Sequence, residues 1–166
     1  MKVIYIILFA LFILTGCGYT IQTQQTLPFE AIAIGSITNT TSEPKLQDRL
    51  LSILNEAAMS YGFYVSKNAR YRLEGEITRF NLKVLSEISL TASEYEVDIA
   101  GNFFLVDTKT SKKHTLTILR PFSSHFITKE RLTDVLIQKE VYTRKALKEI
   151  AQELIREIIY NPPERR

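Results

Sequence analysis

The sequence predicts an α/β (α+β) domain, built as a two-layer sandwich in which two helices pack on one face of a four-stranded mixed β-sheet. Two observations lead to this fold class. Apolar residues recur at helical spacing in two segments, one in the first half of the domain and one at its end. Between these segments, apolar and polar residues alternate with the period of two that is typical of half-buried strands.

The domain is expected to begin with a strand, a helix and a second strand. Residues 31–37 form a short apolar strand, and residues 38–42 (Thr-Asn-Thr-Thr-Ser) supply turn and N-cap chemistry for the helix that follows. Gly62 is a natural C-terminal stop for this helix. Its apolar stripe consists of Leu46, Leu50, Ile53, Leu54, Ala57 and Tyr61. Since a strand–helix–strand connection within one sheet crosses over right-handed, we expect the two strands to be parallel.

The middle of the chain predicts an antiparallel meander of three strands. The first, residues 71–88, changes the phase of its alternation part of the way along, so we expect a β-bulge near Arg79. The second, residues 93–107, alternates throughout. A polar turn then leads into the third strand, residues 114–122. Both pairings in this meander are expected to be antiparallel.

A long helix is predicted from about Thr133 to Tyr160, and Pro162 ends it. The face opposite its apolar stripe carries charges of both signs at spacings of three and four residues, which is typical of a solvated helix face. Residues 162–166 form a C-terminal tail. The apolar stripe consists of Leu136, Ile137, Val141, Leu147, Ile150, Ala151, Leu154, Ile155 and Ile158.

Residues 1–16 have the form of a lipoprotein signal peptide. The apolar run of residues 3–14 is too short to span a bilayer, and residues 14–17 (Leu-Thr-Gly-Cys) have the form of a bacterial lipobox. Cys17 is therefore expected to carry a covalent N-acyl group and S-diacylglycerol, and no other cofactor is expected. Two or three acyl chains hold a protein firmly on a membrane. The alternatives are a plain secretory signal with an incidental cysteine and a buried N-terminal strand.

The mature chain is expected to be one domain on a lipidated tether. Residues 17–29 are polar with a late proline, which suits a tether, and residues 30–161 are long enough for a single core. Gly18, and not Asp, follows the cysteine, which favours retention in the outer membrane. We therefore expect a lipid-anchored protein on the periplasmic face of the outer membrane.

Composition and motifs argue against an enzyme and against a nucleic-acid-binding protein. The formal net charge of +3 is too small for the basic face that nucleic acid requires. No nucleophile elbow, phosphate-binding loop or metal-ligand motif is present. His114 in a strand and His125 in a loop have no partner carboxylate at motif spacing. Glu94, Glu96 and Asp98 alternate with apolar residues, so they mark the exposed face of one strand and no metal site.

The order of elements and several short motifs resemble the lipopolysaccharide-assembly lipoprotein family LptE. The motifs are Cys17-Gly18-Tyr19, Asn39-Thr40-Thr41 before an amphipathic helix, Leu73-Glu74-Gly75-Glu76-Ile77, Glu94-Tyr95-Glu96-Val97 and Lys139-Glu140-Val141-Tyr142. The resemblance implies a non-catalytic outer-membrane protein that lies inside an LptD-type β-barrel. It also implies that the chain helps to assemble that barrel and assists the delivery of lipopolysaccharide to the outer leaflet.

The predicted topology also suggests a site for lipopolysaccharide. If the strands alternate in direction, four basic residues gather at the end of the sheet far from the tether: Lys83, Arg120, Lys129 and Arg131. Arginine offers a bidentate fork and lysine a point charge, and both suit phosphate groups. The resemblance implies basic residues in the same region, although the loop of residues 86–92 contains none. The alternative is that these four cations only solubilise the surface.

Two other functions fit the sequence less fully. The first is a lipid-anchored periplasmic adaptor or pilot protein for another outer-membrane complex, which would use an exposed sheet edge or helix face. The second is an enzyme such as a cell-wall hydrolase, for which the sequence offers no motif. Co-purification of a large outer-membrane barrel would favour the LptE-like reading over both.

Overall fold

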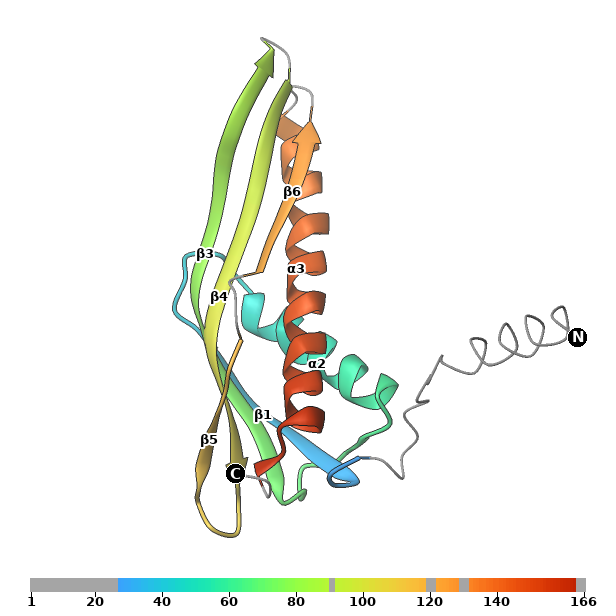
Figure 1. Cartoon of the computed structure of the whole chain (residues 1–166). Coiled ribbons are helices and arrows are strands. Elements are labelled where there is room, and N and C mark those ends of the chain that lie inside the picture. The colour runs from blue at the N-terminus through green and yellow to red at the C-terminus, as the bar shows by residue number, and fades with distance from the viewer. Residues whose placement is uncertain (1–26, 90–91, 119–121, 129–131, 164–166) are drawn as a thin grey trace, which may run out of the picture.

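The computed structural model describes residues 27–89, 92–118, 122–128 and 132–163 of the chain. Their elements are, in order, β1 (Ala31–Asn39), α2 (Leu46–Ser60), β2 (Tyr64–Val65), β3 (Tyr71–Ser89), β4 (Ala92–Asp107), β5 (Lys113–Leu116), β6 (Phe122–Thr128) and α3 (Leu132–Tyr160). Both helices lie on the same face of a mixed sheet, so the predicted two-layer α+β class is confirmed (Figure 1). Within these ranges, neither helix is both long enough and apolar enough to cross a membrane.

The sheet has six strands among the described residues, not the four that the sequence predicted. Their order is β2-β1-β3-β4-β5, and β6 pairs with β4 on the same side as β5. β1 is parallel to β3, as expected for the strand–helix–strand unit, while β4 is antiparallel to β3, β5 and β6. The additional strand β2 is two residues long and is parallel to β1, so not every remaining pairing is antiparallel.

The predicted fourth strand, residues 114–122, does not form as one strand, because β5 ends at Leu116 and β6 begins only at Phe122. Leu116 of β5 stands opposite Phe103, and Phe122 of β6 stands opposite Ile99. The chain therefore advances six residues where β4 advances four, and a continuous ladder cannot form. Pro121, which has no amide hydrogen to donate, falls in this interval of the sequence.

β3 and β4 are the two longest strands of the sheet, and their pairing extends well beyond the end of β1. The expected bulge near Arg79 is confirmed by a register shift between Ile77 and Arg79. A bulge reverses which side chains face the helices, which explains the change of phase in the sequence. A second shift follows between Val84 and Ser86.

The core lies between the sheet and the two helices. Leu50 and Leu54 of α2, Leu147 and Leu154 of α3, and Leu73 of β3 are all fully buried. The predicted apolar stripe of α3 is only partly used, because Leu136, Ile137 and Val141 near its N-terminus are more than half exposed. The buried apolar residues of α3 therefore lie in its C-terminal half, from Ala146 onward.

Two glycines make room for one large core side chain. The Phe103 ring is 1% exposed and lies over Gly75, its cross-strand partner, and Gly101 on its own strand. A Cβ atom at Gly75 would lie 2.3 Å from the Cδ1 atom of Phe103. The ring thus occupies the space that larger residues would fill at these positions.

The start of α2 differs from the prediction. Residues 38–42 do not cap the helix, since its N-cap residue is Lys45, which has left-handed backbone angles (φ 59°) and makes no side-chain capping bond. The polar residues instead form a turn at the end of β1. The Asn39 Oδ1 atom accepts hydrogen bonds from the Thr41 amide (3.0 Å) and the Thr41 hydroxyl (2.8 Å).

Candidate functional site

The outer face of the sheet, turned away from the helices, carries a network of paired charges on β3, β4 and β6. Arg79 donates to Asp98 (Nε to Oδ2, 3.1 Å). The Lys83 Nζ atom lies 3.7 Å from both Glu96 and Asp98. The His125 Nε2 atom lies 3.2 Å from Glu96 Oε1. Glu96 of β4 is therefore flanked by Lys83 of β3 and His125 of β6, while Asp98 is held by two cations of β3.

The structure corrects two expectations here. His125 lies in strand β6, not in a loop, and it does have a carboxylate neighbour. Glu96 and Asp98 share the outer face of β4, but they are not exposed as predicted: Asp98 is 6% exposed and the Glu96 side chain is 17% exposed. Among the described residues, no group of three or more His, Cys, Asp and Glu side chains could hold a metal ion.

Of the predicted site residues, the structure describes only Lys83. It lies in β3 opposite Glu96, with its side chain half exposed. Cys17, Arg120, Lys129 and Arg131 lie outside the described residues.

The expected position of Arg120 rested on a single fourth strand ending at the far end of the sheet. That strand is two, and the one that reaches far along β4 is β6, whose Thr128 stands opposite Ser93. The grouping of the four cations stays a prediction.

A cavity of about 340 Å³ between α2 and α3 was not foreseen from the sequence. Its charged lining contains three basic and two acidic side chains: Lys45, Arg49, Arg144, Asp48 and Glu140. The guanidinium of Arg49 bridges the two helices by donating to Glu140 (2.8 Å). These residues come from helices about ninety positions apart, so only the packing of α2 against α3 reveals the cavity.

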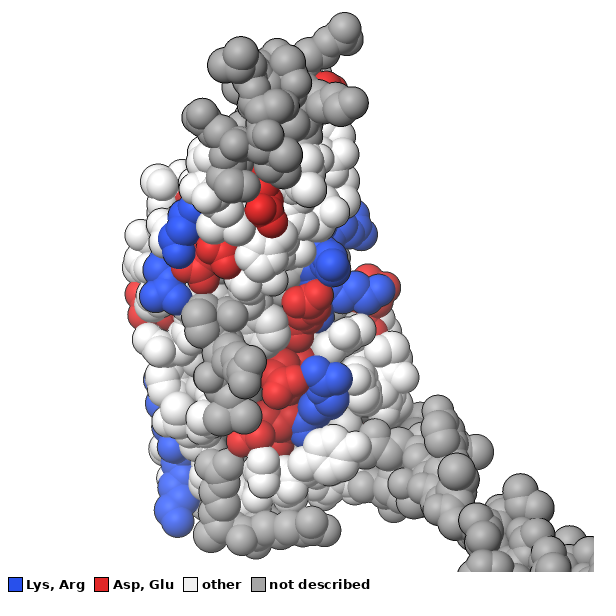
Figure 2. Space-filling view, turned by 45° about the horizontal axis from the view of Figure 1, so that its top comes forward, with Lys and Arg blue, Asp and Glu red and all other residues white. Residues whose placement is uncertain are grey.

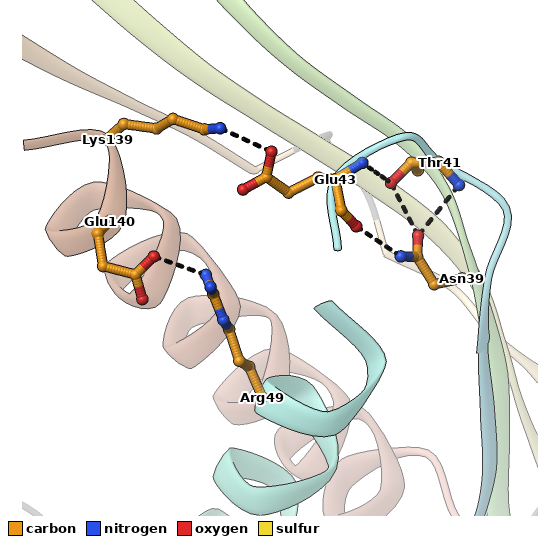
Figure 3. A network of polar contacts seen from close by, with 6 residues as sticks. All are labelled: Asn39, Thr41, Glu43, Arg49, Lys139 and Glu140. Carbon is orange, nitrogen blue, oxygen red and sulfur yellow. Dashed lines mark hydrogen bonds and ion pairs between the residues drawn. The ribbon is translucent and has the colours of Figure 1, made fainter. Parts of the chain in front are cut away.

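A second bridge fastens the turn after β1 to α3 (Figure 3). Lys139 donates to Glu43 (2.6 Å), and both side chains are mostly buried. Two hydrogen bonds within the turn fix the main chain of Glu43. Its carbonyl accepts a hydrogen bond from the Asn39 side chain (2.7 Å), and its amide donates one to the Thr41 hydroxyl (3.3 Å). The Lys139 ammonium also lies 5.3 Å from the centre of the Phe80 ring.

At the other end of the sheet, Asp107 closes the β4–β5 turn. It accepts two hydrogen bonds from the Arg70 guanidinium (2.8 and 3.2 Å) and one from the Lys109 amide (2.9 Å). These donors, Arg70 first, hold the pKa of the Asp107 carboxyl well below its ordinary range, against the opposing effect of burial. The Arg70–Asp107 ion pair has a structural role, because it fixes the start of the β4–β5 turn.

Solved structures of other bacterial proteins have the same two-layer α+β fold, at low sequence identity to this chain. A minor lipoprotein from Acinetobacter baumannii is 17% identical with a TM-score of 0.50, over 80% of this chain and 93% of that chain. A protein from Xanthomonas campestris is 10% identical with a TM-score of 0.52, over 82% of this chain and 87% of that chain.

The sequence itself identifies the family. The model of the lipopolysaccharide-assembly family LptE matches residues 29–161, so the chain belongs to this family. No protein of curated function matches the chain. The resemblance drawn from the short motifs is therefore confirmed.

Proposed function

We propose that this LptE-family protein is a non-catalytic, lipid-anchored outer-membrane protein that plugs an LptD-type β-barrel and helps to assemble it. The lipid on Cys17 would hold it on the periplasmic side of the outer membrane. The observation that carries the proposal is the family match, which spans nearly all of the described domain. In this role the chain assists delivery of lipopolysaccharide to the outer leaflet.

The surface chemistry supports enclosure in a polar lumen. The inside of a membrane β-barrel is lined by polar residues, so a plug needs a charged exterior of mixed sign. Arg79, Lys83, Glu96, Asp98 and His125 provide such a surface on the sheet. Figure 2 shows basic and acidic side chains intermixed over the face in view.

Direct binding of lipopolysaccharide is the second part of the proposal. Its phosphate groups would be met by Lys83, Arg120, Lys129 and Arg131. Lys83 would have to leave or share its two carboxylate neighbours, each 3.7 Å from its ammonium. Both contacts are longer than a hydrogen bond, so this exchange is easier than it would be for a tight ion pair.

Purification of the tagged full-length chain from native outer membranes tests the proposal. We expect one large β-barrel protein to co-purify at equal stoichiometry. Recovery of a different outer-membrane complex would favour an adaptor or pilot function. Recovery of the chain alone would contradict the plug.

A further inference from the structure

β3 has no neighbouring strand on one side for the second half of its length. β1 pairs with β3 only as far as Asn39 opposite Ile77, and the Thr40 amide then donates to the Ile77 carbonyl. β3 continues to Ser89, with β4 on its other side throughout. In the parts of the chain that the structure describes, no strand pairs with the β1 side of β3 beyond Ile77. Figure 1 shows β3 there as the outer margin of the sheet.

We call residues 79–85 of β3 the open edge. It is bounded by register shifts, between Ile77 and Arg79 at one end and between Val84 and Ser86 at the other. Seven residues of strand are about 23 Å long. This length offers a row of unpaired backbone N–H and C=O groups to whatever lies beside it.

The open edge lacks two of the common protections against strand pairing. Edge strands are commonly blocked by proline or by charged side chains that project past the edge. The open edge contains no proline. Its two cationic side chains point away from the edge, toward β4. Arg79 forms an ion pair with Asp98 at 3.1 Å, and Lys83 lies 3.7 Å from the same carboxylate.

Apolar side chains accompany the open edge. Leu82, Val84 and Leu85 are 37%, 58% and 45% exposed. Leu82 and Val84 stand opposite Val97 and Tyr95 of β4, so they face the helix layer.

The opposite margin of the sheet, formed by β6, is different. There the Phe126 ring is buried and stacks on Tyr142 of α3, with ring centres 5.1 Å apart. Ser124, which also faces the helix layer, is buried as well. The helix therefore covers the margin at β6 and leaves apolar surface uncovered at β3.

We propose that the open edge binds an extended segment of the barrel partner by strand addition. A row of alternating backbone donors and acceptors is matched only by another extended main chain. The segment would carry apolar residues toward Leu82 and Val84 and polar residues on the outer face, beside Arg79 and Lys83. This inference rests on the proposed function, because it takes the partner to be the barrel.

The chain's own tether does not fit this position. It enters the sheet beside Tyr71, where β1 begins to pair with β3. Leu85 is fourteen residues further along β3, about 46 Å. The ten residues from Cys17 to Leu27 reach at most about 35 Å when fully extended. The tether therefore cannot run along the whole open edge, because the part near Leu85 is beyond its reach.

Amide hydrogen–deuterium exchange of the full-length, lipidated chain tests the proposal, with and without the co-purified barrel. We expect the amides of residues 79–85 that face the edge to exchange at least about tenfold more slowly in the complex, since each of them gains a backbone hydrogen bond. The margin at β6, residues 122–128, serves as the internal control and should change less. Equal protection of both margins, or protection at β6 alone, would overturn strand addition while the plug still stood. Failure of the complex to form would overturn both proposals.

A matched pair of variants distinguishes strand addition at the open edge from general enclosure of the domain by the barrel. Val84→Asp places one charge on the apolar side of the open edge, where Val84 is 58% exposed, and we expect at least a tenfold loss of barrel affinity. Ile127→Asp makes a similar change at the margin on β6, where Ile127 is 62% exposed, and we expect little loss. Circular dichroism checks that each variant folds. Equal losses would contradict the proposal, as would protection of residues 79–85 in the free chain at high concentration, which would indicate a second copy at the edge.

Discussion

The Lys139 ammonium lies 2.6 Å from the Glu43 carboxylate, joining the turn after β1 to a helix 96 residues further along the chain (Figure 3). The side chains are 23% and 14% exposed, so each charge depends on the other for compensation. The bridge reaches α3 in its N-terminal half, between the exposed side chains of Ile137 and Val141. It holds the far part of α3 against the turn.

We predict that Glu43→Gln lowers the free energy of unfolding by about 1–3 kcal/mol, because it leaves a mostly buried ammonium without its partner. Urea unfolding of the domain without its anchor measures the loss. The neighbouring pair Arg49–Glu140 is the control, since its side chains are 32% and 56% exposed. Glu140→Gln should cost less than about 1 kcal/mol. Similar losses at both positions would show that the burial of Glu43 does not matter.

We predict that Gly75→Ala destabilises the domain by about 1–3 kcal/mol, because its Cβ would collide with the buried Phe103 ring. Gly35→Ala is the matched control. A Cβ there meets the Arg72 side chain at 2.8 Å, and that side chain is exposed and able to move. Thermal unfolding of both variants decides the matter, and an equal loss at the two glycines would contradict the role given to Phe103.

We predict that Asp107 makes part of the domain's stability dependent on pH. The lowered pKa means that the unfolded chain binds this proton more readily, so the stabilisation is fully present above the ordinary value of 3.8. It declines as the pH falls below that value toward the lower pKa of the folded state. Comparison of urea midpoints at about pH 5 and about pH 3 should show a smaller drop for Asp107→Asn than for the parent protein. An unchanged drop would mean that Arg70 does not hold the carboxylate.

We predict that Lys129→Glu with Arg131→Glu weakens binding to phosphorylated glycolipid by about a hundredfold or more, since each of the two lost charge-assisted contacts costs about 1.5–3 kcal/mol. Lys109→Glu with Lys112→Glu is the control. It makes the same change of charge at the exposed β4–β5 turn and leaves Lys113, whose ammonium lies 3.8 Å from the Phe104 ring centre, in place. Equal losses would indicate nonspecific attraction, and no binding by the parent protein would remove the site.

The local patterns of the sequence predicted much of the fold. The stripe from Leu46 and the phase change near Arg79 each reflect a period that one element imposes on its own residues. β6 was not predicted, because its sequence does not show a clear alternation of apolar and polar residues. One of its buried residues is Ser124 and one of its exposed residues is Ile127, the reverse of the usual pattern.

The candidate surfaces depend on relationships that periodicity does not contain. Arg49 meets Glu140 only because α2 and α3 pack in one particular register. Lys83 was expected to be a distal cation, but the β3–β4 register brings two carboxylates beside it. The open edge likewise follows from where β1 stops, and β1 stops at a turn that the sequence suggested as a helix cap.

Enclosure of the domain by one barrel is the central claim, and site-specific photocrosslinking in cells tests it most directly. The probes belong on three separate surfaces: Asn102 on the sheet, Met59 on α2 and Lys145 on α3, all exposed. Contacts spread around a plug predict that all three positions crosslink to the same β-barrel protein. Crosslinks from only one of the three surfaces would contradict enclosure and would indicate a protein docked on the side of its partner.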